Sequence, residues 1–158
     1  QVAFRLLSGR AYTRKEILRK LQDREFGKQA MDQTVADLER LGLIDDRAFA
    51  SKFVESRLRT RPQGRSMMAR DLKRRGIPAE IIDSALEAAY AELDMVEMAL
   101  ELMQTRKNRY RGLERQKALS RMFGFLGRRG FVSVARQVAE QVWQEMGGDV
   151  EDGSDAFA

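Results

Sequence analysis

The sequence contains no cysteine and no histidine. These absences exclude disulfides, thiolate nucleophiles and the usual zinc sites, and they exclude imidazole as a general base. The chain also lacks any apolar run near the roughly 20 residues that a membrane-spanning helix needs, and no signal peptide is visible. We therefore expect a protein that stays out of membranes and, by default, a cytoplasmic one.

Proline is scarce as well, and the remaining composition favours helix. Only two prolines interrupt the 158 residues, and β-branched residues are few. Hydrophobic residues make up 43% of the chain, which is enough for a core, while charged residues reach 34%, which is high for a compact globule. Apolar residues recur at helical spacing without a convincing strand. The sequence predicts an all-α, elongated protein.

Capping and stop signals divide the chain into nine predicted helices. Thr13 and Glu16 form a capping box at the start of the second helix, and Gly42 ends the third. Asp94 opens the seventh helix, and Ser133 is expected to cap the ninth. A basic loop at 106–115 separates the seventh and eighth helices.

A degenerate repeat relates three parts of the chain. It is anchored at Leu21, Leu72 and Leu126, which are 51 and 54 residues apart. Equivalent residues are Ile17, Met68 and Met122 before the anchors, and Arg24, Arg75 and Arg129, then Phe26, Ile77 and Phe131, then Leu38, Ala89 and Trp143 after them. Each unit is a helix followed by a helix-turn-helix pair. The predicted units are residues 1–42, 43–93 and 94–147, followed at 148–158 by an acidic tail that we expect to be disordered.

Residues 42–77 carry the most specific pattern. Leu43-x-Asp45-Asp46-x-x-Phe49-Ala50 is followed by Gly64 and then by Leu72-x-x-x-Gly76-Ile77. Asp45 or Asp46 can cap the helix that follows, and Gly76 is placed to end the next helix in a left-handed conformation. The two adjacent acids could also bind a metal, but such pairs at a helix start are far more often caps.

This ordered set resembles the core of the RecX family, whose members regulate the RecA recombinase. The resemblance extends from about Ala3 to Met146. Gly27 follows Phe26, whereas the other two units place glycine before the hydrophobic residue, so the first turn is expected to differ. Most matched positions look structural, as caps, helix stops and core. They are Leu43, Asp45, Asp46, Phe49, Ala50, Gly64, Leu72, Gly76 and Ile77, with Gly130 and Phe131 as the echo in the third unit.

Positive and negative charge are segregated along the chain. Residues 57–75 hold eight bases and one acid, residues 106–129 hold nine bases and one acid, and residues 76–105 hold seven acids and no base. The net charge is +5, but the tail holds four acids and no base, so the other 147 residues carry 29 bases against 20 acids. Solvated faces of an elongated protein are one explanation. A zoned surface that docks onto a partner of opposite pattern is the other.

Two other classes of function fit the residues less well. In a DNA-binding helix-turn-helix the second helix enters the major groove, but the sixth helix here has no base. The bases gather on first helices and linkers, which suits phosphate or protein contact. Tyr110 is the best candidate to stack on a single strand, unless it packs on its own helices. No Gly-rich phosphate loop is present, so we expect no enzyme and no cofactor.

The resemblance implies tandem three-helix repeats in an elongated, curved arrangement. It also implies binding to RecA and its filament on single-stranded DNA, with inhibition of ATPase, strand-exchange and coprotease activities. The residues alone leave two alternatives, direct binding to single- or double-stranded DNA and a structural adaptor. We expect a monomer that binds through two basic clusters. The second-unit cluster is Arg57, Arg59, Arg61, Arg65, Arg70, Lys73, Arg74 and Arg75, and the third-unit cluster is Arg106, Lys107, Arg109, Arg111, Arg115, Lys117, Arg128 and Arg129.

Overall fold

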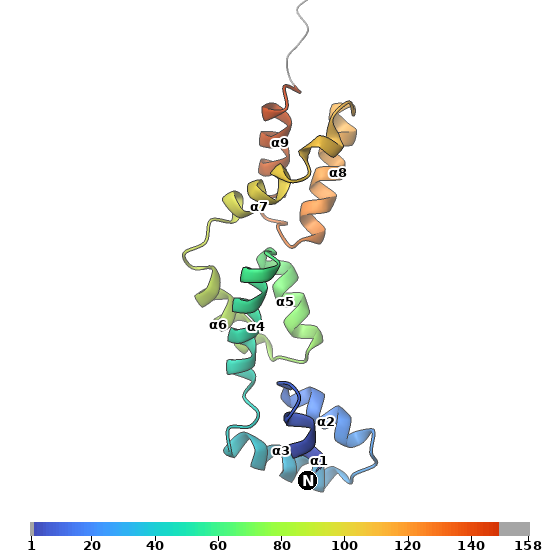
Figure 1. The fold of residues 1–158 in the computed structure, drawn as a ribbon, viewed down its shortest axis with the longest axis vertical. Helices are drawn as coiled ribbons and strands as arrows, with labels where there is room; N and C mark the ends of the chain where they lie inside the picture. The colour runs from blue at the N-terminus through green and yellow to red at the C-terminus, as the bar shows by residue number, and fades with distance from the viewer. Residues whose placement is uncertain (1, 149–158) are drawn as a thin grey trace, which may run out of the picture. The chain divides into compact units, whose positions relative to one another are not determined.

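The computed structural model describes residues 2–148, and every regular element within them is a helix (Figure 1). This confirms the predicted all-α fold. The elements are α1 (Val2–Leu7), α2 (Arg14–Gln22), α3 (Lys28–Arg40), α4 (Asp46–Thr60), α5 (Arg65–Arg74), α6 (Ala79–Tyr90), α7 (Met95–Gln104), the 3-10 helix η1 (Lys107–Tyr110), α8 (Arg115–Arg128) and α9 (Ala135–Glu145). The predicted acidic tail lies outside the described residues except for Gly148.

The contacts within the chain divide it into two compact bodies. Within the described residues, the first body comprises 2–62 and 68–92, and the second comprises 63–67 and 93–148. The start of α5 therefore belongs to the second body, although most of that helix belongs to the first. The finer division into three repeats, with boundaries after residues 42, 93 and 147, stays a prediction.

The first body buries one face of each of its helices. In its N-terminal part, α2 packs on α3, and Ile17, Leu21, Val35 and Leu38 are at most 4% exposed. Farther along the chain, α4 packs on α6. Ala50 and Val54 of α4 are buried together with Ile82 and Leu86 of α6.

The second body is built on α9, which packs against both α7 and α8 (Figure 1). Met103, Met122, Phe131 and Val142 are fully buried where these helices meet. Tyr110 belongs to the same core and is only 6% exposed. Of the two alternatives left open for Tyr110, packing against its own helices is therefore correct, and the side chain is not available to stack on nucleic acid.

The same turn follows the second helix of each predicted repeat. The carbonyl oxygens of Leu21, Leu72 and Leu126 each accept a hydrogen bond from the N–H five residues on, at 3.4, 3.2 and 2.9 Å. This bond closes a turn in which the residue just before the donor takes a left-handed conformation. That residue is Gly76 or Gly130 in the later turns (φ 83° and 87°), but it is Glu25 in the first (φ 59°). The expected difference of the first turn is thus a non-glycine residue in a glycine position.

Most of the predicted helix caps are present, and one is wrong. Thr13 and Glu16 form the predicted capping box, and the Asp94 side chain accepts hydrogen bonds from Val96 N–H and Glu97 N–H. Ser133, however, does not cap α9, because this helix begins at Ala135 with Val134 at the cap position and no side-chain cap bond. The residues before α9 form a turn instead, in which Val134 N–H donates a hydrogen bond to the Phe131 carbonyl.

Candidate partner-binding surfaces

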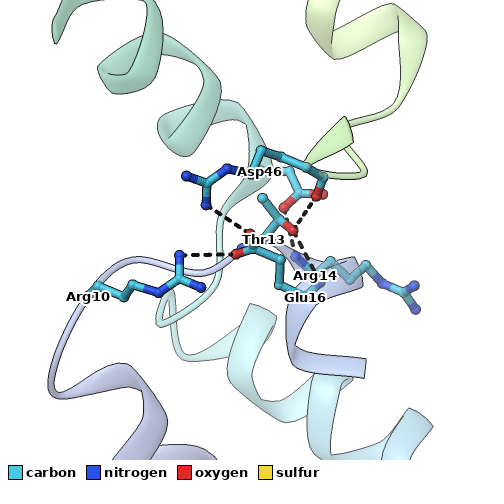
Figure 2. A network of polar contacts seen from close by, with 6 residues as sticks. Arg10, Thr13, Arg14, Glu16 and Asp46 are labelled. Atoms are coloured by element: carbon cyan, nitrogen blue, oxygen red, sulfur yellow. Dashed lines mark hydrogen bonds and ion pairs between the residues drawn. The ribbon is translucent and has the colours of Figure 1, made fainter. Parts of the chain in front are cut away.

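The two acids of the sequence motif cap two different helices. Asp45 Oδ1 accepts a hydrogen bond from Ala48 N–H at 3.0 Å and so caps α4. Asp46 Oδ1 accepts from Arg14 N–H at 2.9 Å, at the start of α2 (Figure 2). The first N–H groups of a helix have no partner within the helix, so Asp46 supplies one across 32 residues of sequence. Both acids thus have a structural role.

A polar network also joins the start of α2 to the end of α5 within the first body (Figure 2). The Thr13 hydroxyl donates to the Arg75 carbonyl at 2.7 Å and accepts from Glu16 N–H at 3.2 Å. Glu16 in turn pairs with Arg75 at 2.8 Å and with Arg10 at 3.6 Å. Gly76 completes the contact, because a Cβ there would lie 2.3 Å from Lys15 Cδ. This glycine is needed both for its positive φ and for close packing.

Gly64 makes the equivalent contact in the second body. Its N–H donates to the Arg129 carbonyl at 2.7 Å, and the Ser66 hydroxyl donates to the Gly130 carbonyl at 3.0 Å. A Cβ on Gly64 would overlap the Gly130 carbonyl oxygen at 2.1 Å. Gly64 stands eight residues before its repeat anchor, as Thr13 does, so both residues approach the same kind of turn in the next repeat.

The remaining motif residues are structural with one exception. Ala50, Leu72, Ile77 and Phe131 are buried, as predicted for core positions. Phe49 is partly buried and stacks on Phe53, with the ring centroids 6.2 Å apart. Leu43, in contrast, is 43% exposed, and its neighbour Ile44 enters the core at 3%. Leu43 is therefore not a core residue, and the position after it is the buried one.

The second-unit cluster divides into engaged and available side chains. Arg75 pairs with Glu16 and lies over the rings of Phe49 and Phe53, at 5.8 and 5.9 Å. Arg57 lies over Phe53, and Arg59 and Arg74 pair with carboxylates one turn away. The available side chains are exposed and pair with no carboxylate of the described residues. They are Arg61, Arg65, Arg70 and Lys73.

The third-unit cluster divides in the same way. Arg115 pairs with Glu140 at 2.7 Å, and Arg106 and Arg129 lie over the Phe125 ring at 4.1 and 5.9 Å. Arg109, Arg111, Lys117 and Arg128 are exposed, and Lys107 is partly buried. None of these five pairs with a carboxylate in the described part of the chain.

A hollow of about 420 Å³ brings part of this cluster together between η1 and α8. We call it the arginine hollow, and its arginines are Arg106, Arg109, Arg121 and Arg128. Arg121 was not among the expected contacts, and neither were Ser120, Gly124 and Phe125, which line the hollow from the same face of α8. The spacing of these α8 residues places them on one helical face, so the sequence could have indicated them as a group. The sequence does not show that η1 lies against this face.

Comparisons with known proteins agree with the motif. The family model of the second three-helix domain of RecX matches residues 45–86, and that of the first three-helix domain matches residues 1–38. Regulatory protein RecX of Streptomyces coelicolor is 36% identical over 151 residues, covering 95% of this chain and 80% of the relative. RecX of Chlorobium phaeobacteroides is 36% identical over 144 residues, covering 90% and 92%. The chain belongs to the RecX family.

The fold agrees with a solved member of the RecX family. The crystal structure of RecX from Lactobacillus salivarius superimposes with a TM-score of 0.75 over 92% of both chains, at 23% identity. Membership of this family of regulatory proteins confirms the expected non-enzymatic role. Within residues 2–148, no helix is long and apolar enough to cross a membrane. No cluster of three or more potential metal ligands occurs in that range either.

Proposed function

We propose that this RecX-family protein regulates a RecA recombinase by binding the filament that RecA forms on single-stranded DNA. Binding would lower the ATPase, strand-exchange and coprotease activities of the filament. One observation carries the proposal beyond family membership: both basic clusters retain exposed side chains that pair with no carboxylate of the described residues.

Charge complementarity explains why such side chains suit this partner. A RecA filament presents protein side chains and DNA phosphates together, so a binding surface needs both signs of charge. The exposed Glu80, Asp83 and Glu87 on α6 supply an acidic face between the basic clusters in the sequence. Complementary potentials speed association and select the partner more than they add affinity. Exposed, unpaired bases contribute most to such steering because no neighbouring acid cancels their charge.

Charge reversal of the available arginines tests the proposal. A variant with Arg61→Glu, Arg65→Glu and Arg70→Glu leaves the tertiary contacts of Arg75 intact. We expect its affinity for RecA assembled on a labelled oligonucleotide to fall by roughly tenfold or more, because like charges facing each other across an interface cost several kcal/mol. Fluorescence anisotropy at fixed ionic strength measures this affinity.

A matched variant controls for net charge. Arg5, Arg19 and Lys28 are exposed and lie outside both clusters, so reversing them changes the total charge equally. We expect this control to bind the filament within about twofold of the unaltered protein, because distant exposed charges are screened by salt. Equal losses in both variants would show that net charge alone governs binding and would remove the second-unit cluster from the proposal.

Direct DNA binding without RecA is the second candidate, and the arginine hollow favours it. Its four guanidinium groups line one concavity with no acid among the described lining residues. A salt titration separates the two candidates. Phosphate contacts on single strands weaken steeply, with a slope of about −0.7 per neutralised phosphate, whereas a protein-dominated interface depends less on salt.

A further inference from the structure

The arginine hollow gathers four arginines in one concavity, whereas several arginines elsewhere are paired with acids. Several exposed arginines elsewhere pair with acids, including Arg14 with Glu39, Arg40 with Asp37 and Arg115 with Glu140. The hollow differs, because none of its four arginines pairs with a carboxylate of the described residues. Four like charges gathered in one concavity repel one another, so the arrangement favours an anion that lies among them.

One of the four side chains, Arg106, packs on an aromatic ring, and a second, Arg128, lies beside Gly124. The Arg106 guanidinium lies 4.1 Å from the centre of the Phe125 ring, and its Nε is buried without a hydrogen-bond partner among the described residues. Arg128 folds back over Gly124, where an added Cβ would lie 3.3 Å from Nη1. Glycine inside a helix costs stability relative to alanine, and here it leaves space for this side chain. Side chains that are already ordered lose less entropy on binding.

We propose that the arginine hollow binds a phosphate group. The guanidinium of arginine presents a planar fork of donors that matches phosphate oxygens two at a time. A single carboxylate would bring only one negative charge to four arginines, whereas a phosphate chain brings several. Ser120 also lines the hollow, and its hydroxyl can add one neutral donor. A volume of about 420 Å³ holds a phosphate together with bound water.

Two sources can supply this chemistry. One is the phosphodiester backbone of a nucleic acid, and the other is the phosphate chain of a free nucleotide or of pyrophosphate. The inference refines the third-unit cluster of the proposed function. Phosphate binding is tested without RecA, so that the two proposals can fail separately. If the hollow binds no phosphate, filament regulation can still hold. If the protein does not regulate the filament, the hollow can still bind phosphate.

The main test removes Arg109 and Arg121, the two arginines of the hollow that make no ion pair or ring contact with the described residues and do not lie against Gly124. A variant with Arg109→Gln and Arg121→Gln is compared with a control carrying Arg19→Gln and Lys28→Gln, which has the same net charge and alters exposed residues outside the hollow and outside both basic clusters. The probe is a labelled oligothymidylate followed by fluorescence anisotropy across salt concentrations. We expect the hollow variant alone to lose roughly tenfold in affinity, with a salt slope smaller by about 1.4, at about 0.7 for each lost phosphate contact.

A second variant blocks the hollow without changing charge. Gly124→Met places a flexible apolar side chain in the space that Arg128 occupies, and it removes a helix-interior glycine, so the fold should persist. We expect it to weaken oligothymidylate binding as the arginine variant does. This agreement would separate a shaped site from a diffuse basic surface.

Competition by ATP and by pyrophosphate distinguishes the sources. If neither displaces the oligothymidylate, the backbone phosphodiester is the ligand. If both bind the unaltered protein and the control but not the hollow variant, free phosphate chains are the ligand. If the hollow variant and Gly124→Met bind all three probes as tightly as the unaltered protein does, with the same salt slope, the proposal is overturned.

Discussion

Arg74 and Arg75 are neighbours in the sequence, but their environments differ. Arg75 Nη1 lies 2.8 Å from Glu16 Oε1, and the guanidinium also lies over two aromatic rings. Arg74 pairs with Asp71 one turn earlier, and its side chain is 69% exposed. Both are basic residues of one cluster in the sequence, yet Arg75 carries a tertiary contact and Arg74 a local one. Variants designed to test binding should therefore leave Arg75 unchanged.

Loss of the Glu16 carboxylate should cost more stability than loss of a surface acid. Glu16→Gln weakens the ion pair with Arg75 and the capping bond to Thr13 N–H. We expect the free energy of unfolding in urea to fall by about 1–2 kcal/mol, since the Glu16 side chain is only 20% exposed. Glu55→Gln, whose acid pairs with Arg59 at the surface, should change it by less than about 0.5 kcal/mol. Equal effects would contradict a special role for Glu16.

Two glycines of the same chain should respond to alanine in opposite directions. Gly64→Ala forces a Cβ into the backbone of Gly130, and we expect a loss of about 1–3 kcal/mol from overpacking. Gly127 lies in α8 with nothing near its missing side chain, so Gly127→Ala should raise stability by up to about 1 kcal/mol through helix propensity. Thermal unfolding of both variants measures the difference. A neutral Gly64→Ala would show that the contact with Gly130 is not tight in solution.

At the scale of helices, a turn with one hydrogen-bonding pattern follows α2, α5 and α8, and in two cases it receives another segment. Thr13 binds the carbonyl after α5, and Gly64 binds the carbonyl after α8. The receiving residues, Arg75 and Arg129, occupy the same repeat position. Helix ends leave carbonyl groups without partners, and these contacts satisfy them. The repeat thus preserves a contact between elements as well as a pattern of apolar residues.

Thr13 should be the most sensitive cap, because its hydroxyl serves two elements. Thr13→Ala removes the hydrogen bond from Glu16 N–H and the one to the Arg75 carbonyl. We expect a loss of about 2 kcal/mol in the free energy of unfolding. Ser133→Ala should stay within about 0.5 kcal/mol because Ser133 caps nothing. A larger loss for Ser133 than for Thr13 would contradict the observed start of α9.

Contacts between residues close in the sequence could be predicted from the sequence, and contacts between distant segments could not. The caps at Thr13, Asp45 and Asp94 and the stop at Gly76 depend on residues within one or two turns, so the sequence predicted them. Asp46 and Gly64 bind segments far along the chain, and nothing local to either residue indicates its partner. The environment of Tyr110 could not be decided for the same reason, because its burial depends on α7, α8 and α9 together.

The arginine hollow shows the same division. Its face on α8 follows helical spacing and was present in the sequence, but the basic clusters were described there as linear blocks of charge. The fold separates members that pair with Glu16, Glu55 or Glu140 from members that pair with no described acid. Charge alone therefore indicated the segments, and only the structure selected side chains within them.

For the molecule as a whole, the account joins family membership to the distribution of charge. Helices with structural caps and tight turns carry exposed bases in two segments and exposed acids on α6. The sequence motif of the RecX family is used mainly to build this scaffold. The proposed contacts with RecA and DNA are made by basic residues outside the motif. Substitutions in the motif should therefore act on stability first, and substitutions in the available bases on binding.

The ATPase activity of RecA on single-stranded DNA tests the central claim most directly. The protein is added to a bacterial RecA at well below one molecule per RecA monomer, and hydrolysis is followed at constant ionic strength. The account predicts strong inhibition that the control with Arg5, Arg19 and Lys28 reversed retains and that the variant with Arg61, Arg65 and Arg70 reversed loses. Unchanged hydrolysis, even with the protein in excess over RecA, would contradict it.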